Sequence, residues 1–372
     1  MVVFAMCAFV FVTFSFLWLC FFQADLLSVS QHLLSEGKTH YNRTIGTVII
    51  TGVLWLLQIG VYSILKLRRY SHALTYFPSL LFLAAITAAR QDTDGQLSFG
   101  HWYWLLPLFL LLWGGGVWVA RTVQPYEANS SAGLLSRPVW VNMLMMALMM
   151  LGVAIVGNTN AVFHYRTHAE TALMDRDFDE ALRVGNESLE TDENLMMLRM
   201  YALSRKGLLG ERLFSYPVVG SSDAMLPTGQ NTRMLMYPVD SVYRHLGAIP
   251  RRNMRSMDYL AAIIRSGQAK PAAADYLLCG YLIDKNLDAF ASEIGRYYTV
   301  GDSLPCHYRE ALVLYTHIRS NPVVVYHSAV LDVDFKDFKQ LEAASGSLSE
   351  RKCKMQDHYA NSYWYYFYYS GN

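Results

Sequence analysis

The chain opens with a run of apolar residues that contains no charge. Residues 2–22 read VVFAMCAFVFVTFSFLWLCFF, and about 20 such residues cross the hydrocarbon core of a bilayer as an α-helix. The run lacks a basic segment in front, exceeds the apolar core of a signal peptide in length, and is not followed by a small-residue cleavage site. We therefore expect a retained membrane span.

Four further apolar stretches follow, and they predict spans over residues 44–65, 70–89, 98–120 and 138–157. The stretch 70–89 contains His72 and Pro78, although proline is tolerated in spanning helices. Only 16% of the chain is charged, against about 25% in soluble domains. The sequence predicts a transmembrane domain over residues 1–157 with about five helices.

Basic residues in the loops orient these spans, because cytoplasmic loops carry the excess of Lys and Arg. One side has Lys66, Arg68, Arg69, Arg121 and Arg137; the other has Lys38, Arg43, Arg90 and Arg166. The cluster at 66–69 favours a cytoplasmic N-terminus. We therefore expect a multi-pass protein of the cell inner membrane whose C-terminal domain is extracytoplasmic, on the periplasmic side.

Residues 158–372 form a second region, in which short helices alternate with turns. The first helix is predicted to end near Met174, with a turn at Arg176 and Asp177 and a second helix that reaches Leu189. This pattern is similar to a tetratricopeptide repeat, a pair of antiparallel helices in about 34 residues. The matching positions are Tyr165, Ala169, Phe178 and Ala181, whereas Glu193 stands where the repeat usually has proline.

Weaker copies of the pattern continue along the chain. Tyr243, Leu246 and Gly247 resemble the opening of a repeat, and Pro271 and Pro305 stand where helices are expected to begin. One long irregular loop, 215–238, interrupts the series. Each helix pair buries one face only against its neighbour, so we predict an all-α fold in which the spans precede a tetratricopeptide-like α-solenoid.

The chain as a whole resembles an uncharacterised family of bacterial multi-pass membrane proteins with a repeat-like C-terminal region. The resemblance rests on LLSEGKTHYNRTIGTVIITGVLWLLQ near the front, and on GLLGERLFSYP, LPCHYREAL and SYWYYFYY in the second region. It implies a membrane location and the two-part organisation. It carries no catalytic residues, because the family has no assigned activity.

The loop after the first span, residues 23–43, offers the strongest chemical hypothesis. His32, Glu36 and His40 are spaced so that one helical face holds all three, which suits a zinc ion. Alternatively, Asp25 or Glu36 acts on a lipid-linked sugar in a membrane glycosyltransferase. The simpler explanation is an interfacial helix whose polar face meets water, which Gly37 favours because it interrupts the helix.

Three other features admit more than one explanation. Gly114, Gly115 and Gly116 either unwind a span around a transported ligand or allow close helix packing. The aromatic tail, 363–369, either caps the helical array or lies at the membrane interface. Cys279, Cys306 and Cys353 permit one disulfide in an oxidising compartment.

The sequence favours a non-enzymatic adaptor that binds an envelope protein through its helical repeats. A membrane enzyme acting on a lipid-linked glycosyl substrate is the alternative, and a transporter component ranks third. The net charge of +1 argues against a nucleic-acid partner. We assign no catalytic, cofactor-binding or metal-ligating residue, and the partners expected are the lipid bilayer and a protein or peptide.

Overall fold

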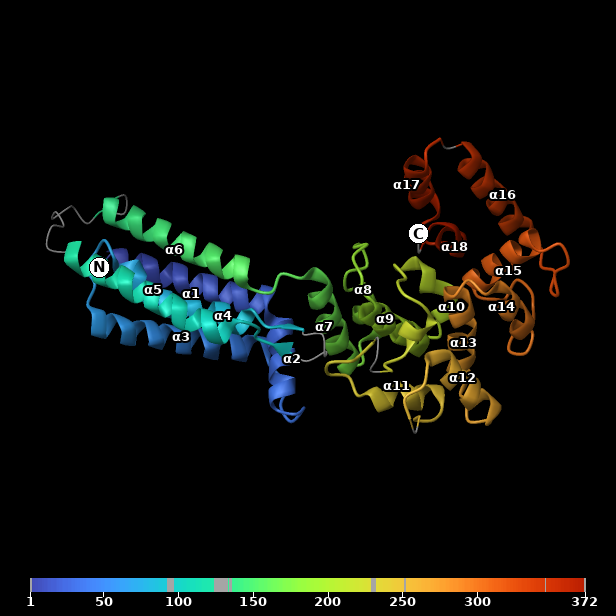
Figure 1. Ribbon diagram of the computed structural model, residues 1–372, viewed down its shortest axis with the longest axis horizontal. Helices are drawn as coiled ribbons and strands as arrows, with labels where there is room; N and C mark the ends of the chain where they lie inside the picture. Colours follow the sequence, from blue (N-terminus) through green and yellow to red (C-terminus); the bar gives the residue numbers. More distant parts are fainter. Residues whose placement is uncertain are drawn as a thin grey trace. The chain divides into compact units, whose positions relative to one another are not determined.

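The computed structural model describes residues 2–91, 97–123, 133, 136–228, 232–250, 252–344 and 346–370 (Figure 1). The chain divides into two compact units, Met1–Asn160 and Ala161–Asn372. The regular secondary structure of the described residues is helical, which confirms the all-α class. A two-residue antiparallel pair, β1 (Arg90–Gln91) with β2 (Leu97–Ser98), is the exception among them.

Long apolar helices build the first unit, and Figure 1 shows several of them running lengthwise beside one another. Four helices of the described chain are long and apolar enough to cross a membrane, fewer than the five expected. They are α1 (Val2–Leu17, continued by a π-helical turn over Trp18–Phe22), α3 (Arg43–Leu65), α5 (Trp102–Val123) and α6 (Arg137–Val156).

The single long helix expected over residues 70–89 is not present, and this part of the prediction was wrong. The segment consists of a 3-10 helix, His72–Tyr76, followed by the 11-residue α4, Phe77–Thr87. Pro78 lies in the first turn of α4, where its missing N–H costs nothing and its fixed φ favours a helix start. Proline therefore begins a new helix here, and α4 alone is about 16 Å long.

Hydrogen bonds to α6 hold the two ends of this segment far apart. The Asn142 side chain accepts from the Ala73 N–H and donates to the Arg69 carbonyl. Asn158, just beyond α6, donates to the carbonyls of Thr87 and Ala89. These two asparagines are about 24 Å apart along α6, so the segment runs the length of the unit in the same direction as α6.

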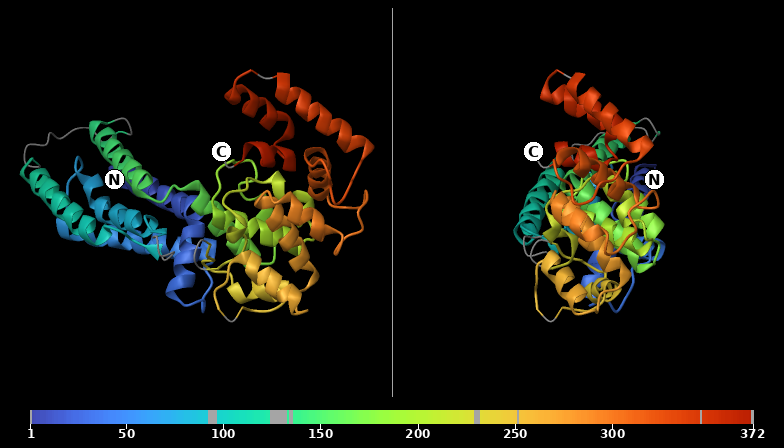
Figure 2. Two further views of the ribbon diagram at one scale, coloured as in Figure 1. Left: turned by 45° about the vertical axis from the view of Figure 1, so that its right-hand side comes forward. Right: turned by 90° about the vertical axis from the view of Figure 1, so that its right-hand side faces the viewer.

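Shorter helices build the second unit (Figure 2). In chain order they are α7 (Ala161–Met174), α8 (Phe178–Arg183), α9 (Glu193–Arg205), α10 (Leu209–Arg212), α11 (Val239–Leu246), α12 (Ser256–Arg265), α13 (Pro271–Ile283), α14 (Leu287–Ile294), α15 (Cys306–Ile318), α16 (Ala329–Ala344), α17 (Leu348–Tyr359) and α18 (Tyr363–Tyr369). One buried apolar core runs through this unit.

The first helix pair of this unit has the predicted turn. Arg176 takes a positive φ of 61°, and the Asp177 carboxylate caps α8 by accepting from the Glu180 N–H. Ala169 and Ala181 are buried where the two helices meet. However, α8 ends at Arg183 rather than Leu189, because Gly185 adopts a left-handed φ of 61° and turns the chain.

Most helices of this unit pack against their neighbours in the chain. The pairs α7–α8, α8–α9, α12–α13, α13–α14, α14–α15, α15–α16 and α16–α17 are in contact, and Figures 1 and 2 both show α16 beside α17. In addition, α9 contacts α13 and α10 contacts α15. Helices that are not successive in the chain are therefore also in contact, unlike in a simple linear stack.

A buried ion pair on α7 holds the end of the irregular loop 215–238. The Glu170 carboxylate accepts from the backbone N–H groups of Leu235, Met236 and Tyr237. Arg166 lies 3.6 Å from this carboxylate, and both side chains are almost fully buried. The Arg166 guanidinium also donates to the Arg233 carbonyl. One carboxylate thus satisfies the backbone donors of residues 235–237, which belong to no helix or strand.

Replacing Glu170 with Ala should destabilise the second unit by about 3–5 kcal/mol, because the buried Arg166 charge and three N–H groups lose their acceptor. Hydrogen exchange of the full-length protein should show faster exchange in peptides that contain residues 233–238. The control is Glu180→Ala, which removes a partly exposed carboxylate paired with Arg183 and should leave that exchange unchanged. Equal exchange in both variants would contradict the role of Glu170.

Candidate functional site

The loop after the first span does not form the His-Glu-His face that the sequence suggested. Helix α2 covers Ala24–Leu34 and ends there. Glu36 and Gly37 follow with positive φ angles of 54° and 77°, so the chain turns before His40. The Glu36 carboxylate is exposed and lies 3.2 Å from the Lys38 ammonium. His32, Glu36 and His40 therefore do not share a helical face.

The two carboxylates considered for an enzyme are separated by the same helix. Asp25 lies in the first turn of α2, whereas Glu36 lies beyond its last turn. Eleven residues of helix place them about 16 Å apart along the axis. A general acid and base, or two ligands of one metal ion, must be much closer, so this loop brings no carboxylate pair together.

Ser204 and His245 form the arrangement closest to a nucleophile and base. The Ser204 hydroxyl lies 2.9 Å from the Nε2 atom of His245. Burial and, to a smaller extent, the cations Arg205 and Lys270 together lower the pKa of His245 to about 4. A catalytic base needs neighbours that stabilise its protonated form. Since these neighbours disfavour that form, the pair is better explained as a partly buried hydrogen bond between α9 and α11.

Cys306, His307 and Glu310, near the start of α15, are a group of potential metal ligands whose donor atoms lie within 4.8 Å of one another in the described chain. The Nδ1 atom of His307 is 3.0 Å from the Glu310 carboxylate, and the Cys306 thiol is 3.7 Å from it. The sequence analysis considered Cys306 only as a disulfide partner. A Cys-His-x-x-Glu spacing within one helical turn is the signal that was missed.

The hydrogen bonds of His307 show why this group does not suit a metal ion. Its Nε2 atom accepts from the Phe214 N–H at 3.3 Å, so in the neutral ring the proton is on Nδ1, the atom that faces Glu310. A protonated Nδ1 has no lone pair for a metal. Burial and the Glu310 and Glu211 carboxylates raise the pKa of Cys306 to about 12, so this side chain is a thiol at neutral pH when no metal ion is bound.

The same cluster joins three parts of the second unit. The Glu310 carboxylate also accepts from the Tyr363 N–H at 2.7 Å, and the Glu310 carbonyl accepts from the Trp364 indole. The hydroxyls of Tyr363 and Tyr366 donate to the carbonyls at the end of α13. Helix α18 is thus largely buried, as the cap hypothesis for the aromatic tail expects.

All five cysteines are free thiols.

Exposed aliphatic side chains recur in one short stretch of the second unit, residues 318–333. We call them the valine patch: Ile318, Val323, Val325, Val330 and Val333, which are 42–78% exposed. Val330 and Val333 share a face of α16 because they are three residues apart. The segment before α16 is tied to α15 by Thr316, which bonds to the Tyr326 N–H. A charged rim flanks the patch, with ion pairs Arg319–Asp288 and His327–Asp332.

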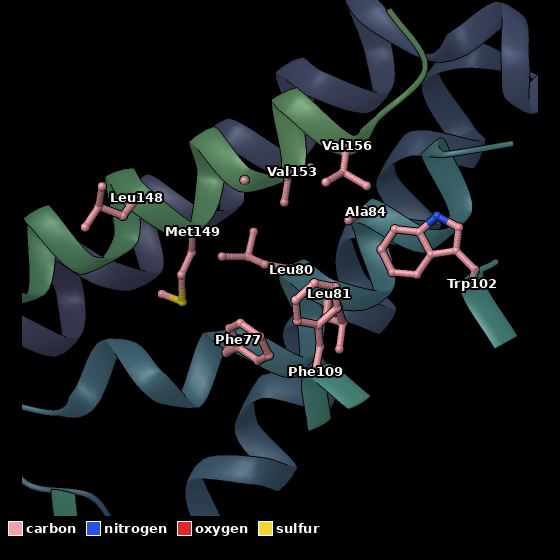
Figure 3. A pocket seen from close by; sticks show the side chains of 11 residues that line it. Phe77, Leu80, Leu81, Ala84, Trp102, Phe109, Leu148, Met149, Val153 and Val156 are labelled. Carbon is pink, nitrogen blue, oxygen red and sulfur yellow. The ribbon is translucent and has the colours of Figure 1, made fainter. Parts of the chain in front are cut away.

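A cavity of about 290 Å³ lies between α4, α5 and α6 in the first unit (Figure 3). Leu80, Phe109 and Val153 are among the side chains that line it, all of them apolar or aromatic. Helix α5 is continuous through Gly114–Gly116, so these glycines do not unwind a span, and a side chain at any of them would meet nothing within 4 Å. They neither bind a ligand through free backbone groups nor pack closely in this chain.

The half-buried His245 predicts a loss of stability in acid. The pKa of this imidazole is about 4 in the folded protein and about 6.5 in an unfolded chain. As the pH falls from about 6.5 towards 4, the unfolded chain takes up a proton that the folded protein does not. The melting temperature of the wild type should therefore fall more than that of His245→Gln between about pH 7.5 and pH 5. Equal falls would contradict this assignment.

His307→Ala should lower the stability of the second unit by about 1–3 kcal/mol, because the Phe214 N–H loses its acceptor. Glu310 keeps the Tyr363 N–H and the Cys306 thiol as donors. Cys306→Ser should be tolerated, because a hydroxyl also donates to Glu310. Zinc added to the purified protein should leave the melting temperature of both the wild type and Cys306→Ser unchanged. A zinc-dependent rise in the wild type alone would restore the metal hypothesis.

Residues 250–370, about a third of the chain, match a family described as "Family of unknown function (DUF6057)". The match covers helices α12 to α18 and includes both the Cys306–His307–Glu310 cluster and the valine patch. It is consistent with the resemblance to an uncharacterised family noted from the sequence. No curated protein and no solved structure matches the chain. The family match therefore assigns no activity to this protein.

Proposed function

We propose that the protein is a membrane-anchored adaptor whose first unit holds it in the bilayer and whose second unit binds another protein. The valine patch is the observation that supports this proposal. Five aliphatic side chains from one short stretch, residues 318–333, are exposed on a unit that otherwise has a continuous buried core. Single exposed apolar residues need no explanation, but grouped ones mark interaction surfaces.

The composition of the patch suits a protein partner. Protein interfaces combine an apolar centre with a polar rim, and here the aliphatic side chains are flanked by the Arg319–Asp288 and His327–Asp332 pairs. Burying one such aliphatic side chain contributes about 1.5–3 kcal/mol. Because association costs at least about 4 kcal/mol, several patch residues must be covered together, and the partner should present an apolar surface of its own.

The proposal includes the finer architecture. Five membrane crossings are supported by the segment 72–87, whose 3-10 and α-helical parts together span about 26 Å between ends held by Asn142 and Asn158. The excess of basic residues puts the loop with Lys66, Arg68 and Arg69 in the cytoplasm. With an odd number of crossings, the adaptor unit then lies on the extracytoplasmic side of the inner membrane. The first helix pair, with Ala169 and Ala181 buried at its contact, supports a tetratricopeptide-like solenoid.

The enzyme and transporter alternatives have no comparable support. Asp25 and Glu36 lie at opposite ends of α2, and Gly114–Gly116 belong to a continuous helix. We therefore do not propose either activity.

Site-specific photo-crosslinking of the full-length protein in its native membrane tests the adaptor proposal. A photoreactive residue at Val325 should give an adduct with one other protein. The same residue at Leu348, which is more exposed (73% against 59%) but lies outside the patch, should not. Adding Val323→Ser and Val330→Ser should remove the adduct because they take apolar area from the interface. The matched control Leu189→Ser should leave it intact.

Two outcomes would contradict the proposal. Identical adducts from positions 325 and 348 would show that the patch has no selectivity. An adduct only between two copies of this chain would show self-association instead of an adaptor function.

A further inference from the structure

A second cavity of the first unit, of about 490 Å³, lies among α2, α3 and α4. Its floor includes the buried Leu54, and its walls include Ile49, Val53 and Phe82, each roughly half exposed. Ile49 and Val53 belong to α3, which is apolar enough to span a membrane. Because their side chains are exposed, the cavity opens towards the surroundings of this helix. We call it the α2 groove.

The α2 groove is apolar along its length and polar at one end. The α3 and α4 residues that line it are apolar, whereas Ser30, Gln31 and Ser35 of the α2 region and Tyr41 bring hydroxyl and amide groups to the other end. Hydroxyl and amide groups can donate hydrogen bonds to the oxygens of a lipid headgroup, so this end suits a polar headgroup.

The position of the groove along α3 matches the depth of a lipid. Helix α3 begins at Arg43, and Ile49 and Leu54 lie about 9 and 16 Å further along it. The hydrocarbon core of a bilayer is about 30 Å thick. The polar end therefore lies near the start of the span, and the apolar part reaches towards the middle of the membrane.

From this geometry we infer that the α2 groove binds one hydrocarbon chain of a membrane lipid, with the lipid headgroup at the end formed by Ser30, Gln31, Ser35 and Tyr41. The volume of the groove is within the range of about 300–1,000 Å³ that small-molecule sites occupy. The cavity of Figure 3 is smaller and has no polar end, so it lacks the headgroup site.

Native mass spectrometry of the full-length protein, released from detergent and titrated with dioleoyl phosphatidylglycerol, tests this inference. The wild type should bind a first lipid more tightly than the following ones. Val53→Trp fills the groove and should weaken the first binding step by about tenfold or more. Leu56→Trp is the matched control, because Leu56 is similarly exposed on α3 but does not line the groove.

A diazirine on the lipid chain supplies an independent measurement. Photolysis should label peptides that contain Val53 and Phe82, and Val53→Trp should reduce this labelling while the melting temperature stays equal to that of Leu56→Trp. Equal lipid affinities for the two tryptophan variants would overturn the inference. Labelling spread evenly over α3 and α5 would also overturn it, because it would show an ordinary annular lipid. The site stands apart from the adaptor surface, so neither result bears on the valine patch.

Discussion

Two asparagine side chains hold the segment that organises the first unit. In hydrocarbon, backbone groups that lack a partner cost several kcal/mol, so a short helix is stable there only if its ends are satisfied by neighbours. Asn142 bonds to Arg69 and Ala73 at one end of the segment, and Asn158 bonds to Thr87 and Ala89 at the other. With its ends satisfied, α4 can be short and central, and α3, α5 and α6 pack against it. Both cavities of the unit have α4 as one wall.

Buried polar clusters have the corresponding function in the second unit. Glu170 organises the loop near residue 235, and Glu310 joins α15 to the start of α18. In each case one carboxylate accepts backbone N–H groups of a segment that is distant in the sequence. Such a carboxylate can be mistaken for a catalytic or metal-binding group if only residue types are considered. The hydrogen bonds distinguish these roles. A carboxylate or imidazole whose lone pairs already accept from protein donors has a structural role.

Several local features were predictable because they depend on short-range rules. Arg176 and Asp177 form the expected turn, and Pro271 begins α13 as expected from the preference of proline for the first helical turn. The continuous helix at 70–89 was mispredicted because hydropathy measures composition and not helix continuity. The extent of α8 was mispredicted because the left-handed conformation of Gly185 ends the helix within an otherwise helical pattern. The helical face predicted for His32, Glu36 and His40 does not form for a similar reason. Glu36 and Gly37 take positive φ angles and turn the chain before His40.

The sequence by itself determined the helical class, the apolar front and the positions of many turns, because these follow from composition and from preferences that act over a few residues. Only the tertiary structure decided which polar groups meet. Glu170 reaches a loop 65 residues away, and His307 accepts from Phe214 across 93 residues. The valine patch and the α2 groove likewise exist only through packing, because exposure is a property of what the neighbouring helices leave uncovered.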